Sequence, residues 1–197
     1  MIVMLAERLS RCADVQSVLD CALDGSLEIS GAHAGNAQLM DWESGHLHIT
    51  AQRGFYDEFL NFFERVEIKH ASACARALRH HHPIIIEDVA ADQEFAPCLE
   101  IARRAGIRAV QSTPLISSSG TLVGILSTHF LTPHRPTNLQ MQALKEIANV
   151  TANTIIRLKA SARAWTPLNS LNSLFESWKA VEHAESLLVR SRSARIN

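Results

Sequence analysis

The segment over residues 107–130 constrains the fold more than any other part of the sequence. Two apolar runs, 107–116 and 121–130, flank Ser-Ser-Ser-Gly at 117–120, which favours a turn between two strands. In the second run Leu122 and Leu126 are expected on one face, and Val123 and Ile125 on the other. A strand with two apolar faces must be covered on both sides. The sequence therefore predicts a central antiparallel hairpin between two layers of other elements.

The rest of the chain supplies a second hairpin and several helices. Residues 36–42 and 46–52 are predicted as strands, and Leu47, Ile49 and Ala51 are expected to share an inner face. Apolar spacings of three and four predict helices that start after Asp14 and Ser72, and others over 55–65, 94–105 and 137–162. Residues 84–86 form a short β-branched strand. The predicted class is α+β, with a largely antiparallel central sheet flanked by helices.

The ends of the chain are predicted to be helical. Residues 1–13 form a lead-in helix that carries Met4, Leu5 and Leu9, and residues 14–162 form the domain. Residues 163–197 are expected to form a C-terminal helical extension, an amphipathic helix with a basic tail. The helix over 137–162 has apolar residues on more than one stripe, so something besides the sheet must cover it.

Charge and composition narrow the possible partners. With 19 Lys and Arg against 20 Asp and Glu, the net charge of -1 disfavours nucleic-acid binding. The longest apolar run, 122–131, is interrupted by polar residues, and the first residues do not have the pattern of a secretory signal. We therefore expect a cytoplasmic protein without a membrane partner. The four cysteines lie far apart, without the spacing of a metal site.

Several segments, in this order, resemble the GAF domain family, most of all the GAF modules of bacterial sensor kinases and related regulators. The similarity extends over about residues 14–158 and is clearest at Gly106–Leu115 (GIRAVQSTPL) and Gly120–Phe130 (GTLVGILSTHF). The other segments that carry it are 35–41, 47–54, 72–78 and 86–95. The resemblance implies the GAF fold, with a small-molecule pocket between the sheet and the short helices.

The same resemblance implies which residues line that pocket. The predicted lining is Leu39, Ser72, Cys74, Val89, Phe95, Val110, Ser112 and His129. The Asn-Lys-Phe-Asp-Glu pattern of cyclic-nucleotide-binding GAF domains is not found, and no cysteine is followed by His, as in many bilin-binding ones. The ligand and any cofactor therefore remain unassigned, and no catalytic or metal-binding residue is predicted.

The resemblance favours a non-enzymatic sensor or regulatory module in bacterial-type signal transduction. Its ligand would act through the terminal helices on a signalling partner protein, and these helices would also pair two copies into a homodimer. Two alternatives stay open. One is a thiol-dependent enzyme like the free-methionine sulfoxide reductases, using Cys74 with Cys98. The other is a purely structural dimerisation module with a closed, empty pocket.

Overall fold

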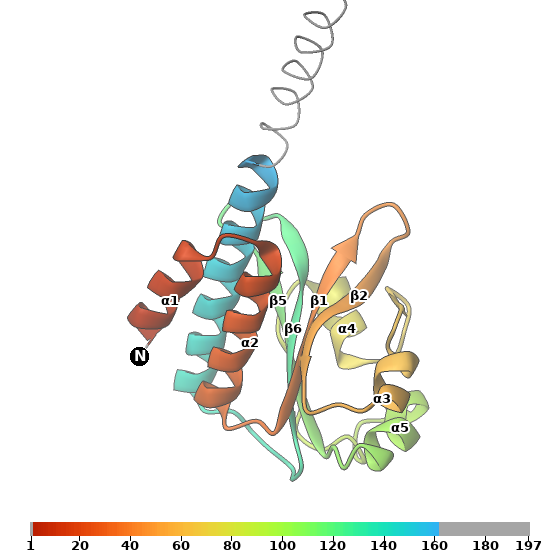
Figure 1. Cartoon of the computed structure of the whole chain (residues 1–197). Coiled ribbons are helices and arrows are strands. Elements are labelled where there is room, and N and C mark those ends of the chain that lie inside the picture. Colours follow the sequence, from red (N-terminus) through yellow and green to blue (C-terminus); the bar gives the residue numbers. More distant parts are fainter. Residues whose placement is uncertain (1, 162–197) are drawn as a thin grey trace, which may run out of the picture. The chain divides into compact units, whose positions relative to one another are not determined.

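The computed structural model describes residues 2–161, which fold around one antiparallel sheet (Figure 1). In these residues six strands pair in the order β3-β2-β1-β6-β5-β4, every neighbouring pair antiparallel. The central pair is β1 with β6, the first and last strands along the chain. The strands are β1 Ala34–Asp41, β2 His46–Arg53, β3 Val66–Glu67, β4 Ile84–Ile86, β5 Ala109–Ile116 and β6 Leu122–Phe130.

Helices cover both faces of the sheet, which confirms the predicted α+β class (Figure 1). We call one side the long-helix face; it carries α2 Val15–Ser30 and a helix over residues 138–161, with α1 Ile2–Arg11 packed against α2. The other side, the short-helix face, carries α3 Asp57–Phe62, α4 Ala73–His80, the 3-10 turn η1 Ala96–Cys98 and α5 Leu99–Arg104. Each face has its own cluster of buried apolar side chains.

The predicted helix starts are confirmed by their capping contacts. The Asp14 carboxylate accepts the Ser17 backbone N–H at 2.8 Å and so satisfies one of the free donors of α2. Ser72 caps α4 in the same way, through the Ala75 N–H at 3.5 Å. Helix α2 ends at Gly31, whose φ of 69° is a left-handed conformation that glycine adopts without strain.

The prediction that Leu47, Ile49 and Ala51 share one face is wrong. Ala37 pairs with Ala51, but its neighbour Gln38 pairs with Ile49, so Thr50 is an extra residue in β2. Such a β-bulge reverses the alternation of side chains beyond it. Leu47 and Ile49 therefore pack on the short-helix face, and Ala51 packs on the long-helix face.

A second irregularity corrects the expected faces of β6. Leu115 pairs with Gly124, whereas Ile116 pairs with Leu122, so the register shifts near the start of the strand. As a result Leu122 and Ile125 belong to the short-helix core, and Val123 and Leu126 belong to the long-helix core. A Cβ at Gly124 would lie 2.1 Å from the backbone oxygen of Gln38, so close pairing of β1 and β6 requires glycine there.

The chain divides into two compact units, Met1–Leu158 and Lys159–Asn197. The predicted amphipathic helix over 163–197 lies outside the described residues. Among residues 2–161, no helix is both long enough and apolar enough to cross a membrane.

Candidate functional site

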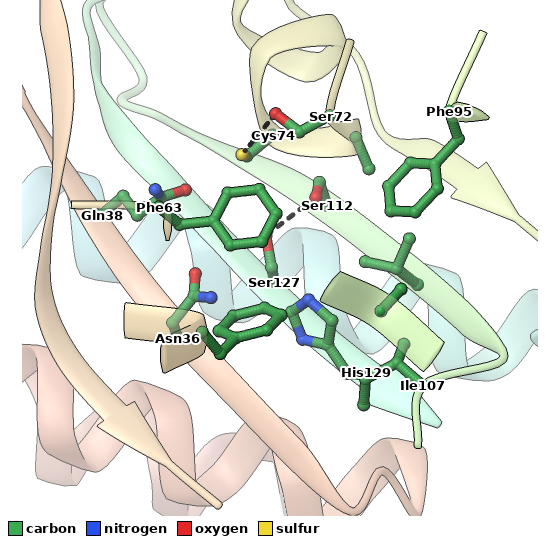
Figure 2. A pocket seen from close by; sticks show the side chains of 14 residues that line it. Asn36, Gln38, Phe63, Ser72, Cys74, Phe95, Ile107, Ser112, Ser127 and His129 are labelled. Atoms are coloured by element: carbon green, nitrogen blue, oxygen red, sulfur yellow. Dashed lines mark hydrogen bonds between the residues drawn. The ribbon is translucent and has the colours of Figure 1, made fainter. Parts of the chain in front are cut away.

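A small cavity of about 30 Å³ lies between the sheet and the short helices (Figure 2). The sheet forms its floor through alternate side chains of β1, β5 and β6, and the short helices and their loops form its walls. The floor residues are Asn36, Gln38, Val110, Ser112, Ser127 and His129. The walls are Phe59, Phe63, Ser72, Ala73, Cys74, Phe95, Ala102 and Ile107.

Most of the predicted lining residues meet at this cavity. They are Ser72, Cys74, Phe95, Val110, Ser112 and His129. Leu39 does not, and its placement is corrected: β1 points Asn36 and Gln38 into the cavity, so Leu39, one residue later, packs on the long-helix face. Val89 also lies outside the lining, buried in the short-helix core, where its N–H donates to the Arg108 carbonyl at 2.8 Å. Ligand binding by these residues stays a prediction.

Two polar pairs in the lining satisfy each other. The hydroxyls of Ser112 and Ser127, cross-strand partners in β5 and β6, lie 2.8 Å apart. The Ser72 hydroxyl lies 3.2 Å from the Cys74 sulfur and 2.9 Å from Nδ1 of His70 (Figure 2). The serine pair links β5 to β6, and the contacts of Ser72 order the side chains at the start of α4.

Other polar atoms of the floor have no hydrogen-bond partner in the protein. They are Oδ1 of Asn36, both amide atoms of Gln38 and Nδ1 of His129. The three side chains are only 4%, 1% and 7% exposed, so water outside the protein does not reach them. Sequence analysis missed Asn36 and Gln38, although polar residues two apart in an otherwise apolar strand share one face and were a usable signal.

His129 is buried under aromatic rings. Phe55 and Phe59 lie edge-on to its imidazole, with centroid distances of 4.9 and 5.9 Å. Burial lowers the pKa of His129 to about 3. The backbone of Ala34 acts in the opposite direction and raises this pKa, but its effect is smaller. The imidazole is therefore neutral at physiological pH, with one nitrogen that donates and one that accepts.

The aromatic wall over His129 comes from α3 and the residues that flank it, and it is weakly anchored. Phe55 stacks on Phe59 at 4.0 Å, and Phe63 lies 4.7 Å from Phe59. The helix has six residues, and its N-cap, Tyr56, makes no side-chain capping bond. Its Glu58 pairs with Arg104 of α5, but both side chains are more than half exposed, and such pairs contribute little.

The wall formed by α4 and the following loop is held more firmly. Arg76 of α4 pairs with Asp92 at 2.8 Å, and both side chains are mostly buried. Asp92 in turn accepts the Phe95 N–H at 2.9 Å, which places the Phe95 ring at the cavity. Arg79 donates to Glu94 of the same loop and to the carbonyl of His70.

The cysteines of this region are protonated thiols. Burial raises the pKa of Cys74 above its usual value, and the hydrogen bond with Ser72 offsets this in part. Burial raises the pKa of Cys98 to about 12. The thiolate is the reactive form of cysteine, so neither side chain is activated in this geometry. Within residues 2–161 no group of three or more His, Cys, Asp or Glu side chains is placed to hold a metal ion.

The sequence of residues 12–155 matches the GAF domain family. The chain belongs to the GAF family. Domains of this family typically sense small molecules or regulate signalling proteins, and they are generally non-catalytic. No curated protein matches the sequence.

Solved structures with the same fold have several different functions. A domain of a two-component sensor histidine kinase protein from Sinorhizobium meliloti is 20% identical, with a TM-score of 0.63; the match covers 78% of this chain and 98% of that one. The GAF domain of a phosphoenolpyruvate-protein phosphotransferase from Coxiella burnetii is 15% identical, with a TM-score of 0.70 and coverages of 82% and 94%. The free methionine-R-sulfoxide reductase of Neisseria meningitidis is 16% identical, with a TM-score of 0.68 and coverages of 81% and 89%. These similarities establish the fold, which sensors and an enzyme share.

Proposed function

We propose that this GAF domain is a non-enzymatic sensor that binds a small molecule in the cavity above β1, β5 and β6. The observation that carries the proposal is the set of unpartnered polar atoms on Asn36, Gln38 and His129. A buried polar atom without a partner costs about 1–3 kcal/mol. A ligand that supplies the missing hydrogen bonds would recover part of that free energy, which gives the cavity a reason to bind.

Binding would require α3 to move. A cavity of about 30 Å³ has room for about one water molecule, whereas small-molecule sites enclose roughly 300–1,000 Å³. The weakly capped α3, with Phe59 and Phe63 filling the space, is the wall best suited to shift. The described state then corresponds to a closed form, and the ligand would select an open one.

Strand β1 offers a route from the ligand to the helices on the far side. Asn36 and Gln38 face the cavity, while Ala37 and Leu39 of the same strand pack in the long-helix core. A Cβ at Gly35 would lie 2.9 Å from the Leu23 side chain of α2, so this strand and helix are in close contact. A shift of β1 would therefore reach α2 and, through it, a signalling partner protein.

The homodimer is part of the same proposal. A groove of about 860 Å³ lies between α1 and the helix over residues 138–161, and Val3 and Met4 of α1 are 72% and 69% exposed. We propose that a second copy of this chain occupies the groove, in the cytoplasm, because apolar side chains this exposed favour a partner. In the full chain Val3→Glu should reduce the dimer measured by light scattering, whereas Ile68→Glu, an exposed apolar residue elsewhere, should not. A monomeric parent protein would refute the dimer.

The thiol chemistry of the alternative enzyme finds no support in this geometry. Cys74 and Cys98 are buried, and burial raises both pKa values, so the thiolate needed to attack a sulfoxide is disfavoured. The Cys74→Ser variant should keep its fold and its ligand. A methionine sulfoxide reductase activity that is present in the parent and lost in this variant would overturn the proposal.

Ligand retention tests the sensor function directly. The full chain is equilibrated with a cell extract, separated from free metabolites and analysed by mass spectrometry under native and denaturing conditions. We expect a small molecule that is enriched on the parent protein and lost from Ser127→Leu, which fills the cavity floor. Ser119→Leu, on the exposed turn before β6, is the control and should retain it. If no compound is enriched, the cavity serves only structure and dimerisation.

A further inference from the structure

The lining of the cavity carries no formal charge. None of the side chains that form it is Asp, Glu, Lys or Arg. Arg76 lies outside the lining, where carboxylates already neutralise it: it pairs with Asp92 at 2.8 Å and with Glu94 at 3.3 Å. The one titratable base in the floor, His129, is kept neutral by burial, which lowers its pKa to about 3. A charged ligand group placed here would lose its hydration without gaining a counter-ion, which costs far more than burying a neutral polar group.

Gln38 gives the floor a specific hydrogen-bonding pattern. Burial raises the pKa of the Cys74 thiol, and the Gln38 amide lies close enough to that thiol to offset part of the rise. Neither Nε2 nor Oε1 makes a hydrogen bond of standard geometry, however, and the Gln38 side chain is 1% exposed. The amide therefore offers one donor and one acceptor side by side, and exchanging the nitrogen and the oxygen leaves that pair intact. A donor–acceptor pair of this kind matches another amide-type edge: a primary amide, a lactam, an imide or a urea.

Asn36 and His129 extend the pattern along the floor. Oδ1 of Asn36, two residues before Gln38 on β1, accepts hydrogen bonds. His129, whose Nδ1 also lacks a partner, points into the same cavity (Figure 2). It lies on the neighbouring strand β6, where it pairs with Ala34 of β1. The rings of Phe59, Phe63 and Phe95 close the space above them. The site thus combines a polar, uncharged floor with an apolar, aromatic roof.

We propose that the cavity selects an uncharged compound that presents an amide-type edge to Gln38 and an apolar body to the aromatic rings. This inference rests on the proposed sensor function and names its ligand class. It excludes compounds that would bury a carboxylate or a phosphate in the cavity.

Matched pairs of small probes test the charge rule. The isotope-labelled full chain is titrated at pH 7.5 with isobutyramide and isobutyrate, then with benzamide and benzoate, and backbone amide shifts are followed by NMR. Each pair has nearly the same shape and differs in charge and in the amide NH2 group, which carries two donors. We expect the amides to shift the signals of β1, β6 and α3, with affinities at least about tenfold above those of the carboxylates.

Two substitutions and one control locate the interaction. Gln38→Leu should weaken amide binding at least about fivefold, and Asn36→Ala provides a second variant with a smaller change in shape. Gln111→Leu makes the same replacement of a buried glutamine on β5, between the cavity residues Val110 and Ser112, and therefore on the opposite face. It should leave amide binding unchanged.

Each other outcome overturns the inference. Carboxylates that bind as tightly as amides would refute the ligand class while leaving the sensor function in place. Equal losses in Gln38→Leu and Gln111→Leu would show that only general stability matters. If no probe shifts cavity signals, the amide class fails, and the extract experiment decides separately whether any ligand is retained.

Discussion

The two faces of the sheet are built differently, although they share every strand. The long-helix face is closed by large apolar side chains such as Leu23, Leu126 and Leu144, each no more than 2% exposed. The short-helix face has an apolar core of its own, but it also encloses a cavity with unpartnered polar atoms and a weakly anchored wall. The two cores therefore differ in how completely their polar atoms and their internal space are filled.

Unpartnered polar atoms are also found away from the cavity. The atoms at the cavity must therefore differ from these in more than the lack of a partner. Oε1 of Gln111 and the hydroxyls of Thr128 and Thr151 lack partners, but none of them lines the cavity. Gln111 still donates through Nε2 to Thr113 at 3.4 Å. Gln38 differs because both of its amide atoms are unpartnered and its side chain lines the cavity.

The largest expected effect is a cavity made in the long-helix core. Leu144→Ala should lower the free energy of unfolding by about 3 kcal/mol, because closely packed neighbours cannot collapse into the space. Phe63→Ala, on the cavity wall, should cost less than half as much, because α3 is free to shift toward the gap. Chemical denaturation of both variants measures the difference. Equal losses would mean that the two faces are equally rigid.

The next effect is a pH dependence that comes from His129. Its folded pKa, about 3, lies below the unfolded value of 6.5, so between these values the unfolded chain binds more protons. Stability should therefore fall as the pH drops below about 6.5, by about 2 kcal/mol between pH 7 and pH 5. His129→Gln should flatten this part of the profile, and His33→Gln, at an exposed position, should not. An unchanged slope in His129→Gln would contradict the assignment.

A smaller effect of opposite sign is expected at Gln38. Gln38→Leu removes two unpartnered buried atoms at similar volume and should stabilise the protein by about 1 kcal/mol. The same replacement at Gln111 also breaks the hydrogen bond to Thr113, so it should bring less or no gain. Thermal unfolding of both variants tests this. If Gln38→Leu instead destabilised the protein, the amide would contribute to the stability of the folded state.

The smallest effect concerns the anchor of α3. Glu58→Gln removes the charge that pairs with Arg104, and the exposed position makes a measurable change in global stability unexpected. Local opening should nevertheless speed up, with about two- to threefold faster hydrogen exchange in residues 57–63. Glu100→Gln, which affects the pair of Arg104 within α5, is the control and should leave α3 exchange unchanged. Equal acceleration in both variants would contradict a specific anchor.

Local sequence patterns were sufficient for the elements and for much of the candidate site. Asp14 and Ser72 cap their helices through contacts within three residues, so the signal is entirely local. Leu39 was misplaced because facing along a strand depends on a one-residue choice that pairing with neighbours decides. The cavity's unpartnered amide of Gln38 could not be predicted, because it is defined by what every other element fails to contact.

The bulge at Thr50 makes β2 tolerant of a one-residue change in length at that position. Arg53, three residues later, pairs with Asp20 at 3.0 Å and with Asp24 at 2.9 Å on α2. Deleting Thr50 would leave a regular ladder in which Ala51 still pairs with Ala37, and Arg53 would still face both carboxylates. Among related sequences, a gap aligned at Thr50 would therefore leave the partners on both sides of it unchanged. A gap at the exposed residues 42–45 would change only the turn.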